Sequence, residues 1–174
     1  MASKKSAEGV NLAGRRALVT GGGRGIGAAI AVALGSVGAD VAINYRRDHE
    51  HAEAVAQEIR QAGTRAEIYA AALDDPEALD AMATNVLADF GTIDIFVHSA
   101  GIASSGATVV DTEEVEIERL WRIHALAAFS LCRRLVPGMR AATRGDVVLV
   151  SSAATTMWAS NSAPYNMAKA SLEA

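Results

Sequence analysis

A short apolar segment runs directly into a glycine-rich turn near the start of the chain. Residues 16–20 read Arg-Ala-Leu-Val-Thr, residues 21–27 read Gly-Gly-Gly-Arg-Gly-Ile-Gly, and residues 28–34 are apolar and typical of a helix. A strand, a glycine loop and a helix in this order are what a dinucleotide site requires. Glycines let the backbone turn tightly and approach a pyrophosphate, whose charge then lies at the helix N-terminus. A plain tight turn is the alternative interpretation of the loop.

The glycines of this turn stand in an unusual register. Gly21, Gly25 and Gly27 form G-x-x-x-G-x-G, although Gly23 to Ala28 also matches the commoner G-x-G-x-x-A. In either register the loop backbone is expected to contact the cofactor. The residues expected to do so are Gly21, Gly23, Arg24, Gly25, Ile26 and Gly27.

The second predicted strand, residues 40–45, ends in basic residues. An NAD site usually places a carboxylate at this point to accept the ribose 2′-hydroxyl. Here the strand ends in Asn44-Tyr45-Arg46-Arg47, and these arginines together with Arg24 are suited to a 2′-phosphate. Tyr45 and Arg46 are therefore expected at the cofactor, and NADP(H) is favoured over NAD(H). A solvated basic turn is the alternative, and the nearby Asp48 keeps NAD(H) open.

Three polar residues near the end of the chain have a spacing suited to proton transfer. Tyr165 and Lys169 are four residues apart, so on a helix they share one face, and Ser152 precedes the tyrosine by thirteen residues. A nearby ammonium lowers the pKa of a phenol from about 10, and a serine hydroxyl can hold a substrate oxygen. This set is suited to reducing a carbonyl or oxidising an alcohol beside a hydride carrier. A chance Tyr-Lys pair and an ordinary Ser-Ser turn are the alternatives.

Together these motifs resemble the classical short-chain dehydrogenase/reductase family, from Arg16 to the end of the chain. The segment from Thr20 to Gly27 is similar to the family's T-G-x-x-x-G-x-G loop, and residues 165–169 are similar to its Y-x-x-x-K. Within the family, the Tyr-Arg-Arg end of the second strand looks like 3-oxoacyl-carrier-protein reductases. The resemblance implies that Ser152 orients the carbonyl oxygen, Tyr165 is the general acid, and Lys169 supports the tyrosine and holds the ribose. It also implies a homodimer or homotetramer, built through the long helix of residues 115–136 and the Tyr-Lys helix.

Three positions depart from the family pattern. His98-Ser99-Ala100-Gly101 stands where the family usually has N-N-A-G, so Ala100 and Gly101 keep the close approach to the cofactor while the bracing asparagine is replaced. The asparagine that holds a relay water corresponds to His124, whose neutral imidazole can both donate and accept. We therefore include His124 among the catalytic residues, with a packed structural histidine as the alternative. The family's aspartate after the third strand, which caps adenine, would fall on Ala72. Asp74 and Asp75 lie nearby but look like the N-cap of a helix opened by Pro76.

The alternation of strands and helices predicts a doubly wound parallel sheet of the Rossmann type. At 174 residues and 51% hydrophobic content, the chain is one domain, with a mobile arm over residues 1–11 and the dinucleotide-binding domain over residues 12–174. The expected strands lie at residues 16–20, 40–45, 65–70, 93–97 and 146–151.

Composition excludes several functions. The net charge of −4 gives no electrostatic case for nucleic acid, and no run of eighteen apolar residues or secretory signal is present. No Cys/His cluster has metal-ligand spacing, and Cys132 in an apolar helical stretch is expected to be a buried, inert thiol. The substrate is expected to be a small carbonyl or alcohol compound, and the location cytoplasmic.

The family continues beyond the Tyr-Lys helix with two more strands, their helices and a loop over the substrate. None of these follows Ala174, so the C-terminal strands are missing and the apolar edge strand at residues 146–151 has no cover. Because a boundary so near Lys169 makes no physical sense, we expect a remainder outside this sequence, with a true fragment as the alternative. The rival functions are a non-catalytic NADP-binding sensor or scaffold and an NAD-dependent alcohol oxidation.

Overall fold

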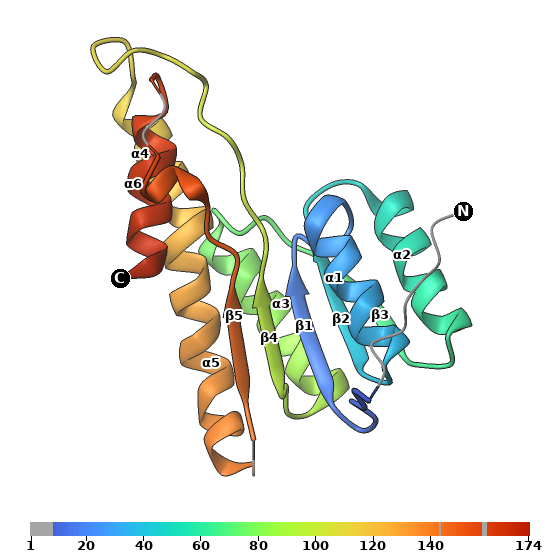
Figure 1. Ribbon diagram of the computed structural model, residues 1–174. Coiled ribbons are helices and arrows are strands. Elements are labelled where there is room, and N and C mark those ends of the chain that lie inside the picture. Colours follow the sequence, from blue (N-terminus) through green and yellow to red (C-terminus); the bar gives the residue numbers. More distant parts are fainter. Residues whose placement is uncertain (1–8, 143, 158–159) are drawn as a thin grey trace.

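The central element of the protein is a parallel sheet of five strands in the order β3-β2-β1-β4-β5 (Figure 1). The structure, a computed structural model, describes residues 9–142, 144–157 and 160–174. The strands are β1 (Arg16–Thr20), β2 (Asp40–Tyr45), β3 (Ala66–Ala70), β4 (Ile95–His98) and β5 (Asp146–Leu149). The predicted doubly wound α/β fold is thereby confirmed.

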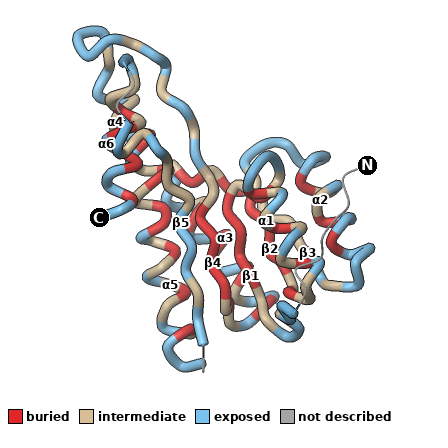
Figure 2. Tube along the Cα trace, in the orientation of Figure 1, coloured by how far each residue is buried: buried red, intermediate tan, exposed pale blue. Residues whose placement is uncertain are grey.

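Helices cover both faces of the sheet. Helices α1 (Gly25–Ser36) and α2 (His49–Gln61) pack on one face, and α3 (Pro76–Phe90) and α5 (Ala127–Ala141) on the other (Figure 1). Side chains alternate accordingly along β1, because Val19 packs toward α1 and α2 whereas Leu18 packs toward α3 and α5. The central strands are therefore buried on both sides, as Figure 2 shows.

The remaining helices lie near the carboxyl end of β5 (Figure 1). Helix α4 (Glu114–Trp121) packs against α6 (Ala163–Glu173), and a short 3₁₀ turn, η2 (Ala153–Thr155), precedes α6. On the side away from β4, β5 pairs with no other strand in the described part of the chain, and its three apolar residues, Val147, Val148 and Leu149, are exposed.

Four predicted elements differ from those observed. Strand β3 begins at Ala66 rather than at residue 65, and β4 spans Ile95–His98 rather than residues 93–97. The fifth strand ends at Leu149 rather than residue 151, because its partner β4 ends at His98, opposite Leu149. The long helix expected over residues 115–136 is divided by a π-helical turn, η1 (Arg122–Leu126), into α4 and α5. Helices bend at such bulges and where a side chain enters the helical hydrogen-bond ladder. Here the imidazole of His98 contacts the Ile123 carbonyl oxygen.

The structure also tests the predictions for the cap of α3 and for Cys132. Asp75 caps α3 by accepting hydrogen bonds from the backbone of Glu77 and Ala78, as predicted. Asp74 is not part of this cap but forms an ion pair with Arg119 of α4 at 3.0 Å. Cys132 is only half-buried, although burial raises the pKa of its thiol and so disfavours the reactive thiolate.

Two features are absent from the described residues. None of their helices is long and apolar enough to cross a membrane, and no three of their His, Cys, Asp or Glu side chains are grouped to hold a metal ion. Residues 1–8 of the expected N-terminal arm lie outside the described residues.

Candidate active site

A cavity of about 880 Å³ lies at the carboxyl ends of the strands. It opens where the strand order reverses between β1 and β4, which is the usual ligand position in an open parallel sheet. Every sequence-predicted site residue except Ser152 lines it. These residues are Gly21, Gly23, Arg24, Gly25, Ile26, Gly27, Tyr45, Arg46, Ala100, Gly101, His124, Tyr165 and Lys169.

The glycine loop brings its own backbone very close to α1. A Cβ atom at Gly27 would lie 2.3 Å from the carbonyl oxygen of Gly21, and Gly21 itself has a φ of 63°. Only glycine tolerates both the positive φ and this approach at no steric cost. The N-terminus of α1 is thereby left open to the cavity, a cradle that fits a pyrophosphate.

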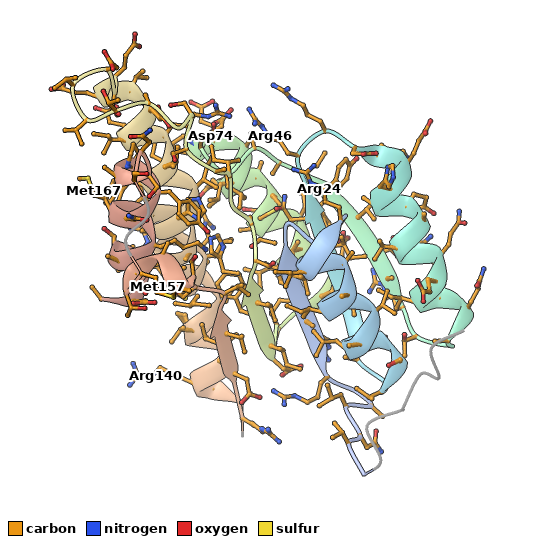
Figure 3. The ribbon with its side chains drawn as sticks, turned by 45° about the horizontal axis from the view of Figure 1, so that its top comes forward. Arg24, Arg46, Asp74, Arg140, Met157 and Met167 are labelled. Atoms are coloured by element: carbon orange, nitrogen blue, oxygen red, sulfur yellow. The ribbon has the colours of Figure 1, made fainter. Side chains whose placement is uncertain are left out.

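Charged side chains surround the loop end of the cavity. Arg24 and Arg46 both line it, and Figure 3 shows them with Asp74 along the same edge of the molecule. Partial burial raises the pKa of Asp74, but the hydrogen bond that Arg119 donates to its carboxylate and the nearby charge of Arg46 contribute to a net lowering of this pKa. The cations can therefore hold a phosphate here, with one carboxylate near Arg46.

Tyr165 and Lys169 lie on α6, as their spacing predicts. The ammonium nitrogen of Lys169 lies 6.0 Å from the centre of the Tyr165 ring and donates a hydrogen bond of 2.6 Å to the Val150 carbonyl oxygen. Burial lowers the pKa of Lys169, and the Glu173 carboxylate partly opposes this shift. The lysine is thus held beside the phenol by a backbone contact after β5.

His124 lies in the π-helical turn and packs edge-on against Tyr165, with ring centres 5.4 Å apart. Its Nε2 lies 2.9 Å from the Ile102 carbonyl oxygen and 3.3 Å from the Ile102 amide nitrogen, and the shorter contact favours the tautomer with the proton on Nε2. Nδ1 is then a buried acceptor with no partner among the described residues. Burial lowers the pKa of His124, so the ring is neutral at pH 7.

Ser152 is placed differently from the other predicted residues. Its hydroxyl accepts a hydrogen bond from the Ala154 backbone and caps η2, and it does not line the cavity, whereas the neighbouring Ser151 does. Met157 is 73% exposed, so it packs no apolar pocket in this structure. Trp158, expected beside it, lies outside the described residues.

Asn44 is a buried site residue that sequence reasoning missed as a functional group. Its amide donates to the carbonyl oxygens of Tyr69 and Ala71, and its side-chain oxygen accepts from Gly21 at 3.4 Å. It thus joins β2 and β3 to the start of the glycine loop. The sequence feature that could have indicated this role is a single amide side chain at the end of an otherwise apolar strand.

His98 is completely buried at the end of β4. Its Nε2 lies 3.1 Å from the Ile123 carbonyl oxygen and its Nδ1 lies 2.9 Å from the Thr20 hydroxyl. The Thr20 oxygen in turn accepts from the Ala100 backbone at 3.3 Å. Burial, which is the main cause, lowers the pKa of His98 to about 4, so the imidazole is neutral.

Comparison with known proteins gives a consistent result. The family model described as short chain dehydrogenase matches residues 15–174. Versicolorin reductase 1 of Aspergillus parasiticus is 42% identical over 141 residues, which are 81% of this chain and 53% of that protein. Versicolorin reductase stcU of Emericella nidulans is 40% identical over 147 residues, which are 84% of this chain and 54% of that protein. The chain therefore spans about half the length of these relatives.

Solved structures are similar over most of the chain. A metagenomic short-chain oxidoreductase in complex with NADP has a TM-score of 0.87 and 40% identity, covering 93% of this chain and 73% of that one. The landomycin C-6 ketoreductase LanV, solved with NADP and rabelomycin, has a TM-score of 0.87 and 32% identity, covering 94% of this chain and 68% of that one.

Proposed function

The chain belongs to the short chain dehydrogenase family, and on this premise we propose that it binds NADP(H) and interconverts a carbonyl compound and an alcohol. One observation carries the proposal: Tyr165, Lys169 and His124 line the same cavity as the glycine loop. The bound cofactor would supply the hydride that passes to or from the carbonyl carbon. Three similar proteins support this function: a versicolorin reductase, a short-chain oxidoreductase solved with NADP, and a ketoreductase solved with NADP.

The residues of the glycine loop would hold the pyrophosphate, and Arg24 and Arg46 the 2′-phosphate. Replacing Arg46 by alanine is expected to weaken NADPH binding about ten- to one-hundred-fold, since hydrogen bonds to charged groups are worth about 1.5–3 kcal/mol. NADH binding should change little, because NADH has no 2′-phosphate. Fluorescence titration of both cofactors measures this, with Arg140→Ala, at the far end of α5 (Figure 3), as the matched control. Equal losses for NADPH and NADH would contradict the assignment.

Tyr165 would donate a proton to the developing alkoxide, and the buried Lys169 ammonium would favour the ionised phenol and hold the ribose. His124 packs on the Tyr165 ring and has an acceptor, Nδ1, without a partner among the described residues. Its Nδ1 would therefore accept a hydrogen bond from a bound water, which would pass protons between the solvent and the tyrosine while the imidazole stays neutral.

The Tyr165→Phe variant tests this role. It keeps the ring that packs against His124 but removes the acid, so NADPH affinity should be retained while kcat falls about 10²- to 10⁴-fold. A spectrophotometric assay of NADPH consumption, with a panel of ketones, rabelomycin and 3-oxoacyl thioesters as substrates, would measure kcat. Turnover like that of the wild type in this variant would refute the mechanism.

Ser152 is proposed to orient the substrate carbonyl, on the strength of the family spacing. Because Ser151 and not Ser152 lines the cavity, the pair Ser151→Ala and Ser152→Ala decides which hydroxyl acts. A loss of kcat confined to Ser152→Ala supports the proposal, and a loss confined to Ser151→Ala transfers the role.

A non-catalytic NADP-binding sensor is the second candidate, favoured by the replaced asparagines and by Ala72 at the adenine position. Micromolar NADPH binding without turnover on the whole panel would favour it. An NAD-dependent alcohol oxidation would instead show tighter binding of NAD than of NADP in a side-by-side titration.

A homodimer or homotetramer is also proposed, built through α4, α5 and α6. Trp121, Phe129 and Met167 are large apolar side chains that these three elements leave 43%, 65% and 54% exposed. Light scattering of Phe129→Glu against the wild type tests this, and an unchanged mass would refute this surface as the interface.

A further inference from the structure

His98 connects three segments that surround the candidate active site. Its imidazole contacts the hydroxyl of Thr20, at the entry to the glycine loop, and the Ile123 carbonyl oxygen, in the π-helical turn. Through Thr20 it is also linked to the Ala100 backbone, which follows β4. We refer to His98, Thr20, Ala100 and Ile123 as the His98 network.

The directions of these hydrogen bonds follow from the donors and acceptors available. The Ile123 carbonyl can only accept, so Nε2 of His98 carries the proton and donates. Because the Thr20 oxygen accepts from the Ala100 N–H, its own hydrogen is free to bond to Nδ1. Every polar atom of the imidazole is therefore satisfied, and only a neutral ring satisfies the network. Burial, with the positive charge of Lys169 acting in the same sense, keeps the ring neutral by lowering the pKa of His98.

The network ends directly beside His124. Ile123 precedes His124 in the π-helical turn, and His124 itself is anchored to Ile102, two residues after Ala100. The two imidazoles thus connect the same two segments, the π-helical turn and the residues after β4, at neighbouring points. Space there is tight, since a Cβ atom at Gly101 would lie 2.5 Å from Cε1 of His124.

We propose that His98 is a positioning residue for His124: its hydrogen bond to Ile123 fixes the π-helical turn so that the His124 ring lies against Tyr165. The proposal rests on the proposed function in that the placed ring serves the proton relay. His98 has no direct part in the chemistry, because it does not line the cavity. Its role is to keep the catalytic imidazole in one place and in one tautomer.

Two substitutions of His98 separate positioning from simple burial. Leucine fills similar space but offers neither donor nor acceptor, whereas the amide of glutamine can accept from Thr20 and donate to Ile123. His98→Leu is expected to lower kcat about 10²-fold, because a displacement of a catalytic group by about 1 Å has an effect of this size. The KM for NADPH should change little. His98→Gln should recover most of the lost kcat. Val41→Ala, a core change in β2 outside the network, is the matched control for lost stability.

The dependence on His124 gives the decisive comparison. The His124→Phe variant already lacks the relay imidazole. In this background His98→Leu should change kcat by less than about threefold, because the effects of two substitutions are not additive when one residue acts through the other. A further tenfold or larger loss in that background, or a kcat of His98→Leu within about twofold of the wild type, would overturn the proposal.

A measurement independent of turnover completes the test. Nitrogen-15 NMR of histidine-labelled protein reports the tautomer of His124, expected as Nε2–H in the wild type and in His98→Gln. In folded His98→Leu the His124 nitrogen shifts should move toward a mixture of tautomers, and unmoved shifts would refute positioning. If the wild type reduces no ketone, the proposed function fails, whereas these NMR shifts still decide whether His98 places His124.

Discussion

Replacing Gly27 by alanine measures how closely α1 must approach the glycine loop. The new Cβ atom would lie 2.3 Å from the Gly21 carbonyl oxygen and 2.8 Å from its carbonyl carbon. Carbon and oxygen normally approach no closer than about 3.3 Å, so the two backbones must separate by about 1 Å. The contact is with backbone, and no rotation of a flexible side chain relieves it.

Two opposing effects set the size of the change. Alanine in place of glycine within a helix gains about 0.5–1 kcal/mol, and overpacking costs about 1–3 kcal/mol. The clash is expected to prevail, so Gly27→Ala should lower the free energy of unfolding by about 1 kcal/mol. Because the shift displaces the N-terminus of α1 from the loop, NADPH affinity should also fall.

Urea denaturation and NADPH titration measure the two effects. Gly63→Ala is the matched control: Gly63 has a φ of 95° with open space around its Cβ position, and it is remote from the cavity. The control should lose stability through backbone strain alone and keep its NADPH affinity. If Gly27→Ala is as stable as the wild type and binds NADPH equally well, the reasoning from close approach is wrong.

Three further predictions concern stability. Burial lowers the pKa of His98 from 6.5 to about 4 in the folded protein, so the fold favours the neutral imidazole. The contribution of His98 to the free energy of unfolding is therefore complete above pH 6.5 and is lost as the pH falls through 4. Urea denaturation from pH 7 to 4 should show up to about 3 kcal/mol of pH-dependent stability that His98→Gln lacks, and parallel curves would contradict this. Asp75→Ala removes the acceptor of two backbone N–H groups at the start of α3 and should cost about 1 kcal/mol, measured by thermal denaturation against Asp111→Ala. Leu131→Ala opens a cavity at a fully buried position and should cost about 2–5 kcal/mol, whereas an effect below 1 kcal/mol would mean that the core around α5 collapses freely.

Local sequence patterns determined much of the fold. The bounds of β1 and β2, the glycine loop between β1 and α1, and the cap of α3 at Asp75 were all predicted from patterns of residues close together in the chain. The common face of Tyr165 and Lys169 follows in the same way, from the periodicity of a single helix. The strand–helix alternation then permits only a parallel sheet covered on both faces.

Tertiary contacts decided what the local patterns left open. The π-helical turn was not predictable from residues 115–136, because the group that contacts Ile123 is His98, 25 residues earlier. Likewise, Lys169 donates to Val150 across 19 residues, and Thr20 meets His98 across 78. A buried polar group must find a partner in three dimensions, and only the completed fold determines which partner lies within reach.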